Sequence, residues 1–401
     1  MVNYVFLSVY FYSVPNLRFS YKGDWSKRKL NEICQFFKGN GLSKSDLSNE
    51  GFPCILYGEL YTTYKNEVIS DIISKTNTTL ANPFLSRNND LIIPGSGEDP
   101  IDIAVARAIY QNDIILGGDL NILRPKSNVS AAFLSYQLNG VRRYDIAKKA
   151  QGKSIVHLHN SDLKEVLVSI PTYDEQLHIV ELLTKIDEMI DAQIKIIDDY
   201  MTYRNAIVDY FFESLSSDWN RIKLSNILKE YSELHVKDNS IVHATLSKEG
   251  IFPKTDRYDR DFLVKDEDKK YKVTHLNDIC YNPANLKFGV ITRNTIGDCI
   301  ISPIYVTFKI ENGFLPKFVE LLVTRKRFIS RARKYEQGTV YERMAVNSSD
   351  LLSMYVSIPS LNTQQTIVNI INNIDNKISN EKELLKLYRA QKVYLLKNMF
   401  I

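Results

Sequence analysis

Cysteines are scarce in this chain and stand far apart, which limits the sites that it can build. The four cysteines of the 401 residues are Cys34, Cys54, Cys280 and Cys299. None belongs to a C-x-x-C pair, and no histidine lies nearby at ligand spacing, so the sequence argues against structural zinc. Free thiols in a protein of this size indicate a reducing compartment, and we expect a cytoplasmic location.

Long hydrophobic runs and a strong net charge are missing too. The apolar start, residues 1–12, has no basic residues in front of it. It is also shorter than the ~20 residues that a membrane span requires, so we expect neither a span nor a signal peptide. The formal net charge is only +4 at pH 7. Any nucleic-acid surface would therefore have to come from local patches of cations.

The sequence patterns of several catalytic sites are absent. Residues 151–154 (Gln-Gly-Lys-Ser) resemble the end of a phosphate-binding loop, but Ala147 stands where its first glycine should be. Residues 267–269 (Glu-Asp-Lys) have the E-x-K spacing of many nucleases, yet no Pro-Asp dipeptide supplies a companion carboxylate. No Asn-Pro-Pro-Tyr or Asp-Pro-Pro-Tyr element for adenine methylation occurs. We expect no catalytic residue and no metal site in this chain.

Two sequence patterns occur twice. The Gly-Asp-Trp, Lys-Leu and Ile of residues 23–33 return as Ser-Asp-Trp, Lys-Leu and Ile in residues 217–227. The Ser-Asp-Leu and Val-Ser-Ile-Pro of residues 161–171 return in residues 349–359. A chain of 401 residues is too long for one compact core. The repeat therefore predicts two similar globules, each followed by an amphipathic segment.

Each repeated proline is followed by a helical pattern. After Pro171, Thr172 and Glu175 form a capping-box pattern. Each segment then runs for about 40 residues without glycine or proline, or about 60 Å as a helix. Such long apolar stripes favour two helices packed antiparallel on each other, although packing of each helix within its own domain stays open. The residues expected at the helix-pair interface are Ile179, Leu183, Ile186, Ile190, Ile197, Tyr200, Ile207, Ile367, Ile371, Ile374, Ile378, Leu385, Tyr388 and Leu395.

These patterns predict an α+β fold in which two similar mixed α/β globules are separated by two long antiparallel coiled-coil-like helices, as a pseudo-twofold internal repeat. Strand-like runs occupy residues 91–93, 114–116, 120–123 and 300–308, and helix-like pieces residues 131–138 and 317–334. The predicted parts are an N-terminal extension (1–22), a first globule (23–171), a proximal helix (172–216), a second globule (217–359) and a distal helix (360–401).

Two basic segments, residues 142–153 and 325–338, each carry clustered cations just ahead of a Gln-Gly dipeptide. Cations clustered at equivalent places could neutralise phosphates on two half-sites, with a solvated helix face as the alternative. Arginines near residue 258 could contact guanine edges, and a tyrosine patch near residue 60 could serve equally as core. The candidate DNA-binding residues are Tyr57, Tyr61, Tyr64, Lys65, Arg142, Arg143, Lys148, Lys149, Lys153, Lys254, Arg257, Tyr258, Arg260, Arg325, Arg327, Arg331, Arg333 and Lys334.

Several short elements match one known family. They are Val14-Pro15-Asn16-Leu17-Arg18-Phe19 leading into Gly23-Asp24-Trp25, the paired Val-Ser-Ile-Pro runs, Glu175-Gln176, Gln364-Gln365, Tyr281-Asn282-Pro283 and Ser302-Pro303-Ile304-Tyr305. With these elements and its two long helices, the chain resembles the specificity subunit of type I restriction-modification systems. Two departures are the first eleven or so residues, which have no counterpart, and Asn362-Thr363, which replace the usual acidic residue.

The resemblance implies a non-catalytic reader of double-stranded DNA. Each globule would be a target recognition domain for one half of a bipartite sequence, and the helices would set the unread gap. It implies two methylation subunits that carry S-adenosylmethionine and two restriction and translocation subunits that carry ATP and magnesium. No cofactor is expected in this chain. The alternatives are a protein-binding coiled-coil scaffold and an unfamiliar nuclease or methylase.

Overall fold

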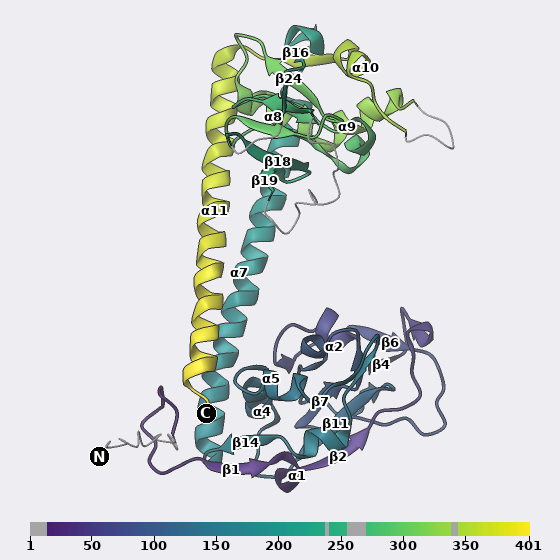
Figure 1. Ribbon diagram of the computed structural model, residues 1–401, viewed down its shortest axis with the longest axis vertical. Helices are drawn as coiled ribbons and strands as arrows, with labels where there is room; N and C mark the ends of the chain where they lie inside the picture. The colour runs from purple at the N-terminus through teal and green to yellow at the C-terminus, as the bar shows by residue number, and fades with distance from the viewer. Residues whose placement is uncertain (1–13, 237–239, 255–269, 338–343) are drawn as a thin grey trace, which may run out of the picture. The chain divides into compact units, whose positions relative to one another are not determined.

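The computed structural model describes residues 14–236, 240–254, 270–337 and 344–401, which form two compact units (Figure 1). Unit 1 takes in the chain up to Lys195 together with Lys382–Ile401, and unit 2 is Ile196–Glu381. The two long helices are α7 (Tyr173–Ser214) and α11 (Leu361–Asn398). Each unit therefore holds one α/β globule, the start of one long helix and the end of the other.

A two-stranded antiparallel sheet leads into each long helix. In unit 1, β1 (Ser26–Lys29) pairs with β14 (Leu167–Ile170). In unit 2, β15 (Asn220–Lys223) pairs with β25 (Tyr355–Ile358) in the equivalent register. The two sequence patterns that recur together are therefore hydrogen-bonded to each other in both globules.

Three further sheets build the globule of unit 1, with strand orders β2-β11-β7-β9-β5, β10-β4-β6-β3 and β12-β13-β8. Their strands are β2 (Cys34–Lys38), β3 (Leu47–Ser48), β4 (Phe52–Ile55), β5 (Val68–Ile69), β6 (Ser74–Thr76), β7 (Asp90–Pro94), β8 (Ser96–Gly97), β9 (Arg107–Ile109), β10 (Ile115–Leu116), β11 (Leu120–Pro125), β12 (Gln151–Gly152) and β13 (Val156–His157). The central strand β7 is buried along its whole length, which explains its continuous apolar run.

Two further sheets build the globule of unit 2, with orders β16-β24-β21-β22 and β17-β20-β23-β18-β19. Their strands are β16 (Leu228–Tyr231), β17 (Leu234–Val236), β18 (Val242–Ser247), β19 (Gly250–Pro253), β20 (Lys270–Thr274), β21 (Ile279–Tyr281), β22 (Ile291–Arg293), β23 (Cys299–Ile301) and β24 (Val306–Ile310). The β16-β24-β21-β22 sheet repeats the antiparallel pairing of β2-β11-β7-β9 in unit 1. The single strand expected over residues 300–308 is wrong, because a turn after Ser302 separates β23 from β24.

Short helices complete both globules. Unit 1 contains α1 (Leu30–Ile33), η1 (Lys44–Asp46), α2 (Glu59–Thr62), α3 (Pro100–Ile103), α4 (Ala131–Asn139), α5 (Arg143–Ala147) and α6 (Asn160–Lys164). Unit 2 contains η2 (Leu224–Asn226), η4 (Pro283–Phe288), α8 (Pro316–Thr324), α9 (Lys326–Ala332), η5 (Arg333–Tyr335) and α10 (Ser348–Ser353). The helix expected at residues 131–138 is α4. The helical run expected over residues 317–334 is interrupted at Arg325, whose backbone is extended.

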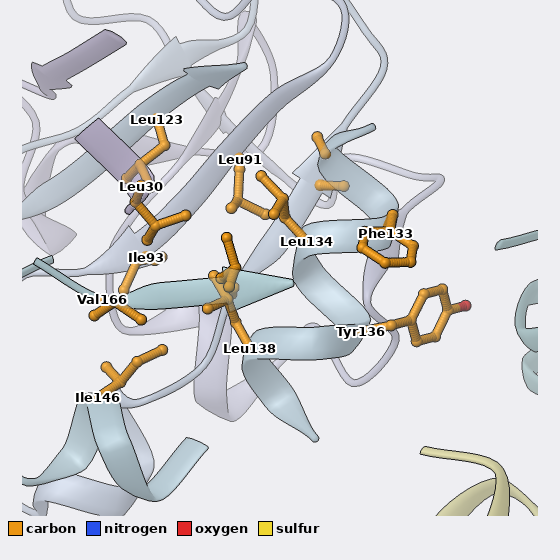
Figure 2. Close-up of a cluster of buried hydrophobic side chains, with 14 of the residues drawn as sticks. Leu30, Leu91, Ile93, Leu123, Phe133, Leu134, Tyr136, Leu138, Ile146 and Val166 are labelled. Atoms are coloured by element: carbon orange, nitrogen blue, oxygen red, sulfur yellow. The ribbon is translucent and has the colours of Figure 1, made fainter. Parts of the chain in front are cut away.

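The core of unit 1 lies around α4, all of whose residues from Ala131 to Leu138 are buried. Figure 2 shows Leu134 and Leu138 of this helix pointing toward Leu91 and Ile93 of β7. Tyr136 points away from the cluster in the same view. Its hydroxyl donates to Asp187 Oδ2 of α7 at 2.7 Å, so α4 connects the sheet to the long helix.

Each long helix ends in the core of the other helix's globule. In unit 1, Phe400, just beyond the end of α11, lies edge-on to Trp25 with ring centroids 6.3 Å apart. In unit 2, Phe212 near the end of α7 lies edge-on to Trp219 at 5.3 Å. The helices also contact each other in an antiparallel sense within each unit, through Lys392–Asp187 and Arg204–Asp375. The predicted fold class is confirmed, and packing of each helix only within its own domain is wrong.

The predicted interface residues lie on covered helix faces. Ile179, Leu183, Ile186, Ile197, Ile367, Ile371, Ile378 and Leu395 are buried. Ile190, Tyr200, Ile207, Ile374, Leu385 and Tyr388 are partly buried. The seam also includes polar and charged side chains that the heptad pattern does not indicate. The assignment of each apolar residue to that seam stays a prediction.

Candidate nucleic-acid interface

A buried glutamine in the first turn of each long helix holds the helix that precedes each basic segment. Gln176 Oε1 accepts from the backbone N–H of Ser130, the N-cap of α4, at 2.9 Å, and its Nε2 donates to Pro171 O at 3.1 Å. Gln364 makes the same two bonds, to Leu315 N at 3.0 Å and Pro359 O at 3.1 Å. The repeated proline-to-helix junction therefore places α4 and α8 in equivalent positions.

The arginine that begins each basic segment contacts the C-terminal end of a long helix, α11 in unit 1 and α7 in unit 2. Arg142 Nη2 donates to the backbone carbonyl of Ile401 at 3.0 Å. The Arg325 guanidinium lies 3.9 Å from the ring centroid of Phe212. Burial lowers the pKa of Arg325 to about 10, so the group stays charged at neutral pH. These two candidates for phosphate contact are thus engaged with helix ends.

Four other cations of unit 2 gather around the exposed ring of Tyr355. The Arg221 guanidinium lies 5.1 Å from that ring centroid, and Lys223 Nζ lies 5.8 Å from it. Arg331 Nη2 donates to the Tyr355 carbonyl at 2.8 Å. A cavity of about 170 Å³ is lined by Arg221, Arg331, Lys334, Tyr335 and Tyr355 among others. We call Arg221, Lys223, Arg331 and Lys334 the unit 2 basic patch.

The remaining candidates of unit 2 are less available or lie outside the described residues. Arg327 pairs with Glu213 at 2.6 Å, and Arg333 pairs with Glu336 at 2.9 Å. Lys254 is partly buried. The candidates that fall outside the described residues are Arg257, Tyr258 and Arg260.

The basic segment of unit 1 is more dispersed. Lys148 and Lys153 are exposed and Lys149 is partly buried. Arg143 Nη2 donates to the Ile101 carbonyl at 3.0 Å. On the neighbouring strand β1, Lys29 pairs with Glu165 at 2.6 Å. The basic segment of unit 1 therefore carries exposed lysines, whereas the equivalent segment of unit 2 contributes to the unit 2 basic patch.

The tyrosine patch of unit 1 divides into a core residue and two cavity residues. Tyr64 is buried, its hydroxyl accepts from Ile73 N at 3.2 Å, and burial raises its pKa. Tyr57 and Tyr61 line a cavity of about 730 Å³. Lys65 is exposed and donates to the Tyr61 carbonyl at 3.2 Å. Tyr57, Tyr61 and Lys65 stay candidates for DNA contact, whereas Tyr64 packs in the core.

Sequence reasoning missed Arg221, Lys223 and Tyr355. The signal lies in the repeat itself, since Arg221 and Lys223 alternate along β15 as Lys27 and Lys29 alternate along β1. Side chains two residues apart on a strand point to one face. A pair of cations at that spacing in both copies indicates a basic strand face.

The described residues contain neither a membrane-spanning helix nor a cluster of metal ligands. No helix among them combines the length and apolar character that crossing a membrane demands. No group of three or more His, Cys, Asp or Glu side chains in the described ranges is arranged to hold a metal ion.

Comparisons with known proteins agree with this architecture. The type I restriction modification DNA specificity domain family matches residues 22–198 and 268–387. The sequence is 20% identical to a Methanocaldococcus jannaschii protein described as the type I restriction enzyme MjaX specificity subunit, over 92% of this chain and 91% of that protein.

Two solved structures share the fold. One is the type I restriction-modification S subunit from M. genitalium, with a TM-score of 0.58 and 17% identity over 97% of this chain and 99% of that chain. The other comes from work on complex assembly and conformational transition of the type I R-M system, with a TM-score of 0.60 and 12% identity over 93% and 96%. Since the family match covers most of the chain and both globules, the chain belongs to the family of type I restriction-modification specificity subunits.

Proposed function

We propose that this chain reads a bipartite target in double-stranded DNA, with one half-site for each globule. The observation that carries the proposal is the combination of a common frame with different interiors. Three features recur in both units: the two-stranded sheet that leads into the long helix, the glutamine contacts and the Trp–Phe contacts. The second sheets differ in strand order and connection. Two similar supports with unlike surfaces suit two different short sequences.

The long helices are proposed to set the unread gap between the half-sites. α7 has 42 residues and α11 has 38, which is about 60 Å at 1.5 Å per residue. One turn of DNA measures about 34–36 Å, so a helix of this length is compatible with half-sites one to two turns apart.

The same helices are proposed to dock two methylation subunits, and two restriction and translocation subunits would complete the complex. Support comes from Ile196, Tyr203 and Tyr210 of α7, which are 40%, 54% and 52% exposed. Their seven-residue spacing puts them on one helix face. S-adenosylmethionine, ATP and magnesium would be bound by those subunits, and this chain would contribute no catalytic group.

Exchange of one globule tests the reading of half-sites. Replacing residues 228–346 with those of another specificity subunit should change one half of the methylated sequence and leave the other half and the gap intact. The matched control replaces residues 34–159 and should change the opposite half. The measurement is methylation-sensitive sequencing of host DNA with the assembled complex. Both halves changing in either exchange would contradict the proposal.

Removal of one heptad from each helix tests the spacing role. Deleting residues 190–196 of α7 together with residues 382–388 of α11 shortens the pair by about 10 Å at 1.5 Å per residue. The unread gap should shrink by about three base pairs, because stacked pairs rise 3.4 Å each. Both half-sites should stay the same. A gap of unchanged length would refute the spacing role while leaving half-site reading intact.

A protein-binding scaffold makes a different prediction. A scaffold has no need of sequence-specific DNA affinity, whereas a reader that neutralises phosphates loses affinity steeply as salt rises. Titration of the assembled complex onto target DNA at several salt concentrations therefore separates the two hypotheses.

A further inference from the structure

A buried group of charges joins the two long helices in unit 1. Lys392 of α11 contacts Asp187 Oδ1 of α7 at 2.5 Å and Glu67 Oε2 of the globule at 2.6 Å. These side chains are only 16%, 5% and 7% exposed. Burial by itself lowers the pKa of Lys392, but the charges and hydrogen bonds of Glu67 and Asp187 outweigh it, and the net effect raises that pKa. We call these three residues charge site 1.

Unit 2 has an equivalent group, charge site 2. Arg204 Nε of α7 contacts Asp375 Oδ1 of α11 at 2.5 Å, and Lys317 Nζ of α8 contacts Asp375 Oδ2 at 3.2 Å. Their side chains are 24%, 31% and 21% exposed. Burial alone would raise the pKa of Asp375, but the hydrogen bond and charge of Arg204, with Lys317, lower it.

The two charge sites are related by the internal repeat. The step from Asp187 to Arg204 along α7 equals the step from Asp375 to Lys392 along α11. Each helix therefore carries an acid near its start and a base near its end. Both ion pairs require the same antiparallel alignment of α7 with α11. The third member comes from the globule and differs in sign, Glu67 in one site and Lys317 in the other.

A shift of one heptad would break both pairs. Asp187 would then face Leu385 or Met399, and Arg204 would face Val368 or Lys382. Within the helix seam the apolar residues penalise such a shift weakly, because a heptad repeat returns an apolar side chain at each step. The helix ends resist it as well, through Phe400 on Trp25 and Phe212 on Trp219. A buried charge without its partner is strongly unfavourable. Charged or polar groups within an apolar helix interface are known to specify register in coiled coils.

We propose that charge sites 1 and 2 fix the register of α7 against α11, and that this register determines the length of the unread gap. The second half of the statement rests on the proposed function, and the first half does not. Lys392, Asp187, Arg204 and Asp375 are accordingly positioning residues that act on specificity through the helix pair.

The test is a variant in which both sites are neutral. Charge site 1 is changed by Glu67→Gln, Asp187→Asn and Lys392→Met. Charge site 2 is changed by Asp375→Asn and Arg204→Met. Lys317 keeps its contact with Glu320 at 3.4 Å, and the buried Arg107 near charge site 1 keeps its hydrogen bonds to the Tyr64 and Ala106 carbonyls, so the chain is expected to fold. Retained helical circular dichroism and assembly with the methylation subunits check this.

Two controls separate register from charge in general. One exchanges the charges within each pair, by Asp187→Lys with Lys392→Asp and by Arg204→Asp with Asp375→Arg. It also carries Glu67→Gln and Lys317→Met, because these two side chains would otherwise face a like charge. The pairing between the helices is thereby restored. The other neutralises Glu181 and Lys185, an exposed pair within α7 at 2.5 Å that cannot report on α11. Both controls should behave as the unaltered chain.

Cysteine cross-linking reports the register without DNA. Ile190→Cys with Tyr388→Cys lies one turn from the Lys392–Asp187 pair, whereas Ile190→Cys with Leu395→Cys matches a one-heptad shift. All four native cysteines are buried and do not compete. In the otherwise unaltered chain the first pair should cross-link at least tenfold faster than the second. In the neutral variant the two rates should approach each other. A preserved tenfold difference would overturn the proposal.

Sequencing of methylated DNA reports the gap. The neutral variant should methylate the same two half-sites at more than one gap length, and the charge-exchanged control at one. Loosened cross-linking with a single retained gap would overturn the link between register and gap. If the unaltered complex methylated no bipartite site, the proposed function would fail, while the cross-linking result would still decide the register.

Discussion

Charge sites 1 and 2 occupy equivalent places in the two units and differ in burial. In charge site 1, Asp187 and Glu67 are only 5% and 7% exposed, and Lys392 is their common cation. In charge site 2, Asp375 is 31% exposed and has two cations. The effective dielectric rises with exposure, so equal contacts are worth more in unit 1. One repeated helix frame therefore supports two local electrostatic solutions of unequal strength.

The first prediction measures that inequality. Lys392→Met leaves Glu67 and Asp187 buried together without a cation, and should cost about 3–5 kcal/mol of local stability. Arg204→Met leaves Asp375 with Lys317 and should cost about 1 kcal/mol, as more exposed pairs do. Hydrogen exchange of the amides near the end of α11 and near the end of α7 measures each unit separately. Equal losses would show that exposure does not govern the two sites.

The second prediction concerns a feature that the two units share. Gln176→Met and Gln364→Met each leave a backbone N–H without its acceptor, buried at Ser130 and partly buried at Leu315, which costs about 1–3 kcal/mol. The two losses should be similar, because the contacts to Ser130 and Leu315 are similar in length. Faster exchange of the Ser130 and Leu315 amides measures them.

The neighbouring Gln365 serves as the control for these glutamines. It is exposed, and its side chain donates to Asn369 Oδ1 at 2.8 Å. Gln365→Met should change stability by less than about 0.5 kcal/mol. A loss at Gln176 without one at Gln364 would mean that the repeated junction supports only one globule.

Periodicity and repetition predicted the frame of this fold from sequence. Apolar spacing indicated both long helices, and residues 91–93 indicated the buried strand β7. Residue spacing could also have indicated the two charge sites, because an acid and a base recur in each helix at the same step. These elements can be predicted from the sequence because the spacing that indicates each of them lies within one short segment.

Contacts between residues far apart in the sequence could not be predicted in the same way. The run at residues 317–334 is interrupted at Arg325, whose guanidinium lies on Phe212 from the end of α7. Glu175, predicted to cap its own helix, instead accepts from Arg18 Nε at 2.6 Å and Trp25 Nε1 at 3.2 Å. Both partners depend on tertiary packing, which outweighs local propensity. Tyr64 is buried and Tyr61 is partly exposed, and this difference likewise depends on tertiary packing.

The third prediction compares the basic surfaces of the units. Arg221→Ala with Lys334→Ala should lower the slope of log affinity against log salt by about two, because each phosphate contact contributes about 0.9. Lys27→Ala with Lys148→Ala tests the equivalent surface of unit 1. Titration of target DNA over a range of salt concentrations gives both slopes.

The control for the salt slopes is Arg333→Ala, since that arginine is paired with Glu336. Its effect should be smaller than that of either double variant. An unchanged slope in the Arg221 and Lys334 variant would remove the unit 2 basic patch from the DNA contact surface.

A pH dependence should also differ between the units, and its unit 2 part is the smallest of the expected effects. In unit 2, His275 Nδ1 lies 3.0 Å from Asp298 and Nε2 lies 3.1 Å from Glu233, and these hydrogen bonds raise its pKa above 6.5. Its stabilising contribution is therefore complete below about pH 6.5 and is lost as the pH rises through the raised value. Because the ring is 44% exposed, the loss should be only a few tenths of a kcal/mol.

Unit 1 should respond in a more acidic range. Burial, partly offset by Lys392, raises the pKa of Asp187 to about 6 from 3.8. Its contribution is complete below about 3.8 and is lost as the pH rises through about 6. Hydrogen exchange of each unit between pH 4.5 and 8.5, corrected for intrinsic rates, should place the two losses in separate windows. His275→Gln should abolish the upper one alone. If that upper loss persisted in the variant, another group of unit 2 would have to carry it.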